Sequence, residues 1–141
     1  MAVPSGVAAL YAGLGCRRGA PASELAGLLR DVMQSRNLPF AALVALASID
    51  LKRQEPGLLQ LAADLGLPLH FFNAVQLAPY TPRLSHRSAI AFQHSGCYGV
   101  AESSALALAE QLDGGLAELR VERIVRDDMT LALAWIPASG G

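Results

Sequence analysis

The sequence predicts an α/β fold: a mixed, largely parallel sheet with helices on both faces and an antiparallel C-terminal hairpin. Two apolar runs, at residues 7–14 and 41–48, are typical of strands buried on both faces, and each precedes a polar loop and a helical pattern. This repeated order predicts parallel strands joined by helices. The apolar alternation at 129–135 instead predicts one arm of a hairpin.

Length and composition indicate a single domain over residues 1–141. The chain has 141 residues, of which 52% are hydrophobic, and a formal net charge of −1. This charge argues against a nucleic-acid partner, which normally requires a basic surface. No stretch reaches the roughly 18 apolar residues of a membrane span, and no basic residue precedes the first apolar run as in a secretory signal. We therefore expect a cytoplasmic protein without a membrane partner.

Two strand–helix units account for the first half of the chain. The predicted elements are a strand at 7–14, a helix from Pro21 to Gln34, a strand at 41–48, and a helix that starts near Pro56 and stops at Gly66. Proline suits the first helical position, because the N–H it lacks has no partner there. The predicted cap, Ala20, has no side-chain oxygen, so a ligand or water must satisfy the first-turn donors.

The second half begins with a short strand at 69–72 and a helical turn at 74–78. Residues 79–99 are rich in proline, serine and glycine, which predicts a long loop with one element near Ile90. Such a loop is more often a lid or a binding loop than a simple connection. A helix at 100–112 and strands at 117–125 and 129–135 complete the fold.

The loop Gly15-Cys16-Arg17-Arg18-Gly19 is the first candidate site. Counted from Gly13, the G-x-G-x-x-x-G spacing departs from the dinucleotide fingerprint, and no acidic residue ends the second strand, so a nicotinamide cofactor is disfavoured. Glycine N–H groups and a helix start favour an anion, and the two arginines add donors suited to carboxylate or phosphate. We expect the arginines to serve affinity rather than stability. A helix start would also lower the pKa of the Cys16 thiol. The alternative is a tight turn with solvated arginines.

The loop after the second strand is the second candidate site. It holds Ser48, Asp50, Lys52 and Glu55, and Lys52 is the only lysine of the chain. The three charged groups are candidates for acid–base catalysis, or they form a structural salt-bridged cluster. Because both loops follow parallel strands, we expect them side by side at the carboxyl edge of the sheet.

Other polar residues give weaker signals. Glu102, in the first turn of its helix, is explained by the helix dipole, but it joins the site if the loop at 95–99 carries it there. His86 and His94 are expected to be solvated. The two cysteines and the three histidines show no metal-ligand spacing, so no metal and no cofactor are expected.

Together these segments resemble the cobalamin biosynthesis CobE family. The resemblance is carried by GCRRG at 15–19, SIDLK at 48–52, EPGL at 55–58, LGLPL at 65–69, FF at 71–72 and GVAE at 99–102. That family is similar to the C-terminal domain of CbiG, the hydrolase that opens the lactone ring of cobalt-precorrin-5A. The chain departs from the family at Ala20, where threonine is common, and at Arg123, where lysine is common.

The resemblance implies a mixed α/β domain that holds or acts on a corrinoid, a tetrapyrrole-derived macrocycle ringed by carboxylates. Its ligand-binding residues would be Gly15, Cys16, Arg17, Arg18, Gly19, Ser48, Asp50, Lys52, Glu55 and Glu102. We expect an accessory or carrier role, because the chain lacks the N-terminal region of CbiG, and other B12-pathway enzymes are expected partners. The alternative is a precorrin side-ring hydrolase or lyase, with Asp50, Lys52 and Glu55 as acid–base groups.

Overall fold

The computed structural model describes residues 8–137, and it confirms the mixed α/β fold. One sheet contains five strands in the order β3-β2-β1-β5-β4. The strands are β1 (Leu10–Cys16), β2 (Leu43–Ile49), β3 (Leu69–Phe72), β4 (Glu118–Arg126) and β5 (Met129–Trp135). The pairs β1–β2 and β2–β3 are parallel, whereas β1–β5 and β4–β5 are antiparallel. Only β5 therefore runs against the other four strands.

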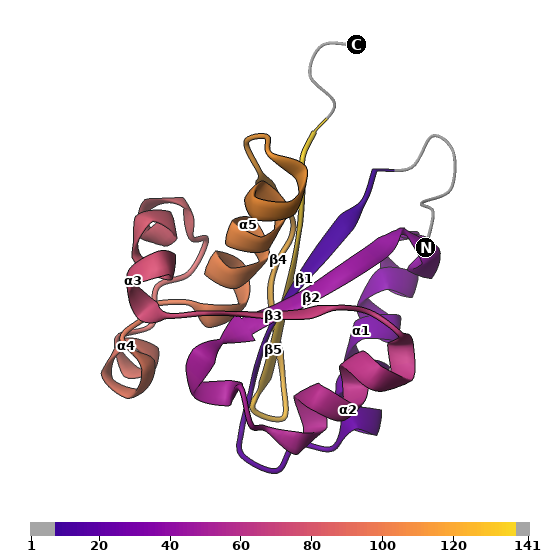
Figure 1. The fold of residues 1–141 in the computed structure, drawn as a ribbon, viewed down its shortest axis with the longest axis horizontal. Coiled ribbons are helices and arrows are strands. Elements are labelled where there is room, and N and C mark those ends of the chain that lie inside the picture. The colour runs from indigo at the N-terminus through magenta and orange to yellow at the C-terminus, as the bar shows by residue number, and fades with distance from the viewer. Residues whose placement is uncertain (1–7, 138–141) are drawn as a thin grey trace.

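Helices cover both faces of this sheet (Figure 1). One layer contains α1 (Ala22–Ser35) and α2 (Pro56–Leu65). The other contains α5 (Val100–Asp113), with α3 (Ala74–Leu77) and α4 (Ala89–Ser95) beside it. Each layer packs its own hydrophobic cluster against the sheet, as expected for strands buried on both faces. Short 3₁₀ turns occupy Phe40–Ala42, Asp50–Lys52 and Ala78–Arg83.

The boundaries differ from the sequence predictions at the first strand and its helix. The strand begins at Leu10 and includes Gly15 and Cys16, which the sequence placed in the loop. Val7, its predicted start, lies outside the described residues. The helix cap is Pro21 and not Ala20, because Pro21 keeps an extended backbone and the first helical residue is Ala22. No side chain caps this helix.

Gly13 explains how closely α5 approaches the sheet. A Cβ atom at this position would lie 1.9 Å from the carbonyl oxygen of Ala101 and 2.7 Å from the backbone nitrogen of Ala105. The first glycine of the G-x-G pattern therefore serves helix packing inside a strand. This close contact replaces the phosphate-binding role that a dinucleotide fingerprint would give it.

The long segment before α5 is more structured than the sequence predicted. The expected element near Ile90 is α4, capped by the Ser88 hydroxyl, which accepts from the Ala91 N–H at 3.1 Å. The Phe92 ring stacks on the Tyr98 ring with 4.4 Å between centroids, which closes α4 onto the glycine-bearing loop after it. No helix in the described range 8–137 is long and apolar enough to span a membrane.

Candidate functional site

A cleft of about 1110 Å³ opens at the carboxyl ends of β1 and β2, and we call this space the cleft. Three parts of the chain form its walls: the ends of β1 and β2 with their loops, the segment 88–101, and the β4–β5 hairpin. Its lining includes Gly15, Cys16, Arg17, Arg18, Lys52, His94, Tyr98 and Arg123. Residues distant in sequence therefore share one concave surface.

The expected proximity of the two loops is confirmed. The parallel pairing of β1 with β2 brings both carboxyl ends to one edge. One side chain then joins the two loops, and another joins the two strands. The Gly19 N–H donates to Glu55 Oε2 at 2.9 Å, and the buried Ser48 hydroxyl donates to the Leu14 carbonyl at 2.6 Å. Ser48 and Glu55 thus stabilise this edge of the sheet through hydrogen bonds, and neither residue lines the cleft.

Arg17 and Arg18 both line the cleft, but they differ in their contacts. The Arg17 guanidinium donates to the Asp127 carbonyl at 2.6 Å, and its backbone N–H donates to the Asp128 carbonyl at 3.1 Å. It also lies 3.5 Å from the Glu24 carboxylate. Arg17 therefore makes structural contacts that the sequence did not predict. Arg18 is exposed, and the described residues offer its side chain no hydrogen bond or ion pair.

The three candidate acid–base residues are not brought together on one surface. Lys52 is half-buried and lines the cleft, whereas the Asp50 side chain does not. The Glu55 carboxylate is buried and accepts the Gly19 N–H. Of the three residues, Lys52 alone lines the cleft, and Glu55 fixes the loop behind it. This arrangement suits electrostatic binding better than proton transfer between neighbouring groups.

Cys16 lies at the end of β1 and not at a helix start, since α1 begins only at Ala22. Burial raises the pKa of the Cys16 thiol above its usual value, and the positive charges of Lys52 and Arg17 offset this only in part. The lowered pKa expected from the sequence is therefore wrong. Cys16 lines the cleft, and its raised pKa disfavours the thiolate form that a nucleophile requires.

Glu102 does not reach the cleft surface, although the neighbouring Ala101 does. Its carboxylate is 1% exposed and accepts the Arg123 N–H at 2.9 Å and the Ser85 N–H at 2.8 Å. The Ser85 hydroxyl also donates to it. The loop before α5 does carry Glu102 towards the site, as the sequence suggested. Its side chain, however, binds the backbone of Ser85 and of Arg123 and does not line the cleft.

Two parts of the cleft were not predicted from the sequence: the wall formed by segment 88–101 and the cleft-lining Arg123. His94, expected to be solvated, is exposed at the cleft, whereas His86 bonds to the Ser85 hydroxyl through Nδ1 at 2.8 Å. No spacing rule connects these residues to the loops after β1 and β2. The only early signal was the length and composition of the loop at 79–99.

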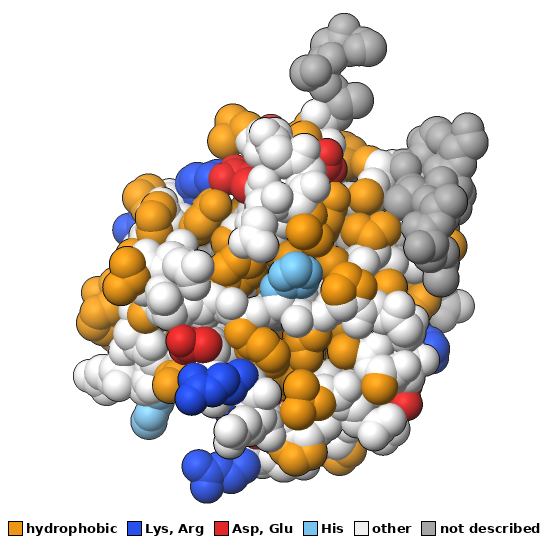
Figure 2. Space-filling model, viewed as in Figure 1, with side chains coloured by type: hydrophobic (Ala, Val, Ile, Leu, Met, Phe, Trp, Pro, Cys, Tyr) orange, Lys and Arg blue, Asp and Glu red, His pale blue; other side chains and the backbone are white. Residues whose placement is uncertain are grey.

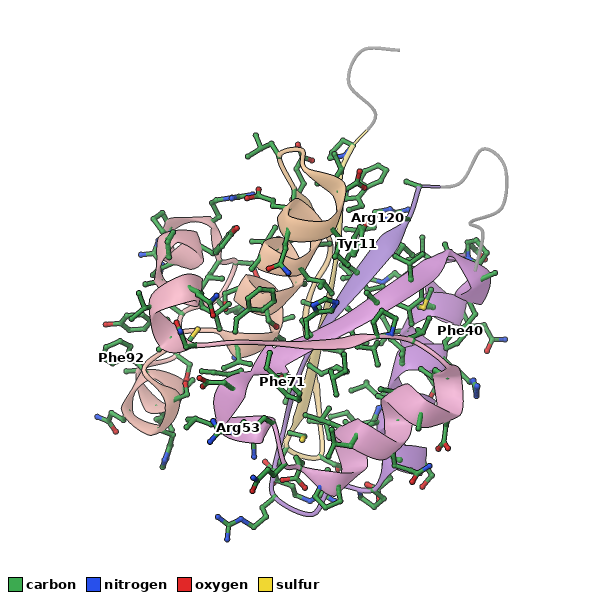
Figure 3. The ribbon with its side chains drawn as sticks, viewed as in Figure 1. Tyr11, Phe40, Arg53, Phe71, Phe92 and Arg120 are labelled. Carbon is green, nitrogen blue, oxygen red and sulfur yellow. The ribbon has the colours of Figure 1, made fainter. Side chains whose placement is uncertain are left out.

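The cleft combines positive charge with an apolar rim. Arg17, Arg18, Lys52 and Arg123 line it, against the single acidic side chain of Asp128. Three exposed apolar side chains also belong to the lining: Leu51 (64% exposed), Ile90 (69%) and Val125 (56%). Figure 2 shows basic side chains at the lower edge of the molecule, next to apolar ones. Arg53, labelled in Figure 3, belongs to the same loop as Lys52 but not to the lining.

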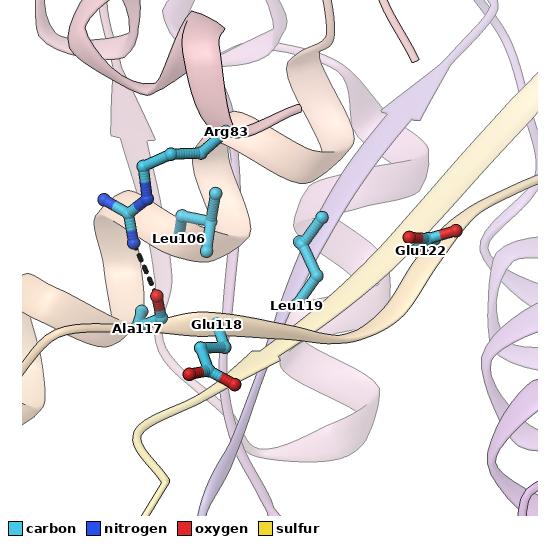
Figure 4. Close-up of a pocket in the computed structure, with 6 residues that line it drawn as sticks. All are labelled: Arg83, Leu106, Ala117, Glu118, Leu119 and Glu122. Atoms are coloured by element: carbon cyan, nitrogen blue, oxygen red, sulfur yellow. Dashed lines mark hydrogen bonds between the residues drawn. The ribbon is translucent and has the colours of Figure 1, made fainter. Parts of the chain in front are cut away.

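A second, smaller pocket of about 280 Å³ lies between α5 and β4 (Figure 4). The Arg83 guanidinium crosses it to the Ala117 carbonyl at 2.5 Å, while Glu118 and Glu122 make its other side acidic. This pocket has less than a third of the volume of the cleft, and a structural arginine already fills part of it. Among residues 8–137, no group of three histidine, cysteine or acidic side chains could hold a metal ion.

The comparisons with known proteins agree on one family. Residues 10–134 match the family described as Cobalamin synthesis G C-terminus. Protein CobE of Sinorhizobium sp is 37% identical over 127 residues, which cover 90% of this chain and 80% of that protein. A cobalt-precorrin-5A hydrolase of Priestia megaterium is 27% identical over 91% of this chain, which spans only 32% of that enzyme.

A solved structure supports the same assignment. The crystal structure of CobE, a protein from the cobalamin (vitamin B12) biosynthetic pathway, superposes with a TM-score of 0.87 at 46% identity, covering 96% of this chain and 95% of the other. The family match over residues 10–134, the 37% identity to Protein CobE and the 46% identity to the CobE crystal structure all indicate the same family. The chain therefore belongs to the family Cobalamin synthesis G C-terminus, and it is a cobalamin biosynthesis protein of the CobE and CbiG C-terminal type.

Proposed function

We propose that the cleft binds a corrinoid intermediate through its side-chain carboxylates, and that the protein acts as an accessory or carrier in the pathway. The observation that carries this proposal is the combination of four cationic side chains with an apolar rim in one large concave surface. A corrinoid presents the complementary pattern, since its macrocycle is apolar on its faces and ringed by acetate and propionate groups. Arginine and lysine donors are suited to these carboxylates.

The size of the cleft supports a ligand of this class. Small-molecule sites usually measure about 300–1,000 Å³, and the cleft, at about 1110 Å³, lies at the upper end of this range. It is open to solvent on the side of Ile90 and Leu51, both largely exposed. The corrinoid macrocycle would enter from this side, with its carboxylates directed to Arg17, Arg18 and Lys52.

The competing function is hydrolysis of a precorrin side ring, with Asp50, Lys52 and Glu55 as acid–base groups. The observation that favours it is the identity with proteins named cobalt-precorrin-5A hydrolase, although the matches span only 32% and 20% of two such enzymes. Against it stands the separation of the three side chains, because Lys52 alone lines the cleft and Glu55 is bound to the Gly19 N–H. The carrier role is the function that the geometry favours.

Incubating the purified protein with successive pathway intermediates separates the two functions. A carrier should form a coloured 1:1 complex from which the intermediate is recovered unchanged, whereas a hydrolase should release a product. The readouts are the absorption spectrum of the bound corrinoid and mass spectrometry of the released compound. A new product formed at a rate that scales with protein concentration would contradict the carrier proposal.

Substitution of Lys52 provides the sharper test. Arginine keeps the positive charge and similar reach but does not deprotonate in proteins, so Lys52→Arg should retain much of the binding and of B12 synthesis, whereas Lys52→Met should lose both. Arg53→Met, in the same loop but outside the cleft lining, is the matched control. A Lys52→Arg protein that binds as tightly as the parent but cannot restore B12 synthesis would establish the catalytic function instead.

A further inference from the structure

Arg123 lies in a bulge of β4 that alters the direction of its side chain. Val121 pairs with Leu133 and Ile124 pairs with Leu131, so a step of three residues in β4 faces a step of two in β5. A bulge of this kind breaks the regular alternation of side chains between the two faces of a sheet. Arg123 thereby lines the cleft, while the next residue, Ile124, packs against the cluster on the α1 side.

The bulge is held by the buried carboxylate of Glu102. The backbone N–H of Arg123 donates to Glu102 Oε2 at 2.9 Å, and Glu102 Oε1 accepts the backbone N–H of Ser85 at 2.8 Å. Ser85 lies three residues before Ser88, where the second wall of the cleft begins. One carboxylate in the first turn of α5 therefore fixes both the strand that presents Arg123 and the segment opposite to it.

The guanidinium group of Arg123 has an incomplete set of hydrogen bonds. Its Nε is buried and has no hydrogen-bond partner among residues 8–137. A buried donor without an acceptor is costly, so such groups are rare in folded proteins unless they serve a function. Arg123 is one of the residues that line the cleft, so a ligand carboxylate bound there can accept a hydrogen bond from its guanidinium group.

We propose that Arg123 binds a carboxylate of the ligand in the cleft, and that Glu102 is the positioning residue that aims it there. This inference rests on the proposed function and adds to it a specific binding residue. It also explains why an acidic side chain is buried behind the cleft without lining it. Glu102 acts on binding only through the bulge and the Ser85 segment.

The test compares cobyrinic acid, a corrinoid with free side-chain carboxylates, with its fully methyl-esterified form. Parent protein should prefer the acid, and Arg123→Ala should reduce this preference about tenfold, the effect of losing one charge-assisted hydrogen bond. Arg123→Lys should recover part of the loss, since it restores the charge. Arg126→Ala is the matched control, because Arg126 pairs with Asp31 of α1 on the other side of the sheet. A preference that stays within about twofold of the parent in Arg123→Ala would overturn the proposal.

The positioning role has its own measurement. Glu102→Gln keeps the shape of the side chain but places an amide donor against N–H groups that need an acceptor, so it should also reduce the acid preference. In the double variant with Arg123→Ala the reduction should not grow, because both changes act on one contact. Additive effects would exclude the positioning role. If the parent protein bound neither probe, the proposed function itself would fail, whereas normal acid preference in Arg123→Ala would remove only this inference.

Discussion

At the scale of single residues, the cleft shows that neighbouring side chains of one type can have separate roles. Arg17 is bonded to two carbonyl groups of the β4–β5 turn, and Arg18 is exposed beside it. The turn itself places Asp127 and Asp128 at positive φ angles of 51° and 63°, the arrangement of a tight hairpin connection. Arg17 therefore couples the loop after β1 to the hairpin that presents Arg123.

This difference predicts separate outcomes for two single substitutions. Arg17→Ala should weaken corrinoid binding and also lower the free energy of unfolding by about 1 kcal/mol, since it removes a hydrogen bond to the turn. Arg18→Ala should weaken binding while changing stability by less than about 0.5 kcal/mol. Thermal or urea unfolding alongside a binding titration measures both effects. Equal stability of the two variants would show that the Arg17 contacts contribute nothing.

Cys16 offers a chemical probe of the cleft. Because burial raises its pKa, little thiolate is present near neutral pH, and alkylation by iodoacetamide should be several-fold slower than for a free cysteine. A bound corrinoid should slow the reaction further, since Cys16 lines the cleft. Peptide mass spectrometry separates it from Cys97, which is buried and serves as the internal reference. A rate at Cys16 that is insensitive to bound corrinoid would place the ligand elsewhere.

At the scale of elements, the sequence predicted most of what local patterning controls. The strand–helix units, the hairpin and the proximity of the two loops follow from apolar periodicity and from the rule that parallel strands end at one edge. The cap at Pro21 and the bulge at Arg123 were not predictable, because both depend on backbone geometry. The packing role of Gly13 was not predictable for a related reason: a glycine that allows a helix to approach and one that allows a phosphate to approach look alike in sequence.

The packing role of Gly13 leads to a prediction about β1 and α5. Gly13→Ala should destabilise the protein by about 1–3 kcal/mol, the usual range for overpacking, because the new Cβ would collide with the backbone of α5 at Ala101. Gly27→Ala is the control, since nothing lies within 4 Å of a Cβ there and alanine favours the helix. Urea unfolding of both variants should therefore give shifts of opposite sign. A neutral Gly13→Ala would mean that α5 can move away from the sheet without cost.

At the scale of the whole molecule, α5 joins the cleft to a polar network near its other end. Val100 and Ala101 line the cleft, while Glu110, eight positions after Glu102, lies about 12 Å further along the helix axis. Glu110 accepts from Tyr80 at 3.0 Å, from Arg83 at 3.0 Å and from the Ala117 N–H at 2.9 Å. The same helix is thus fixed at two points. Glu102 binds the connecting segment and β4, and Glu110 binds the connecting segment and Ala117, directly before β4.

The Glu110 network should make stability depend on pH in a defined range. Burial alone would raise the pKa of Glu110, but the bonds from Ala117, Arg83 and Tyr80 outweigh it and hold the pKa below its usual 4.5. A carboxyl group with a lowered folded-state pKa stabilises the protein above that usual value, and the contribution is lost as the pH falls through the folded-state pKa.

Glu110→Gln should therefore cost about 1 kcal/mol at neutral pH, and the difference from the parent should shrink below about pH 4.5. Urea unfolding across this range measures it, with Glu118→Gln as the control, because Glu118 is exposed at the neighbouring pocket. A difference that did not change with pH would show that Glu110 acts through its shape and hydrogen bonds and not through its charge.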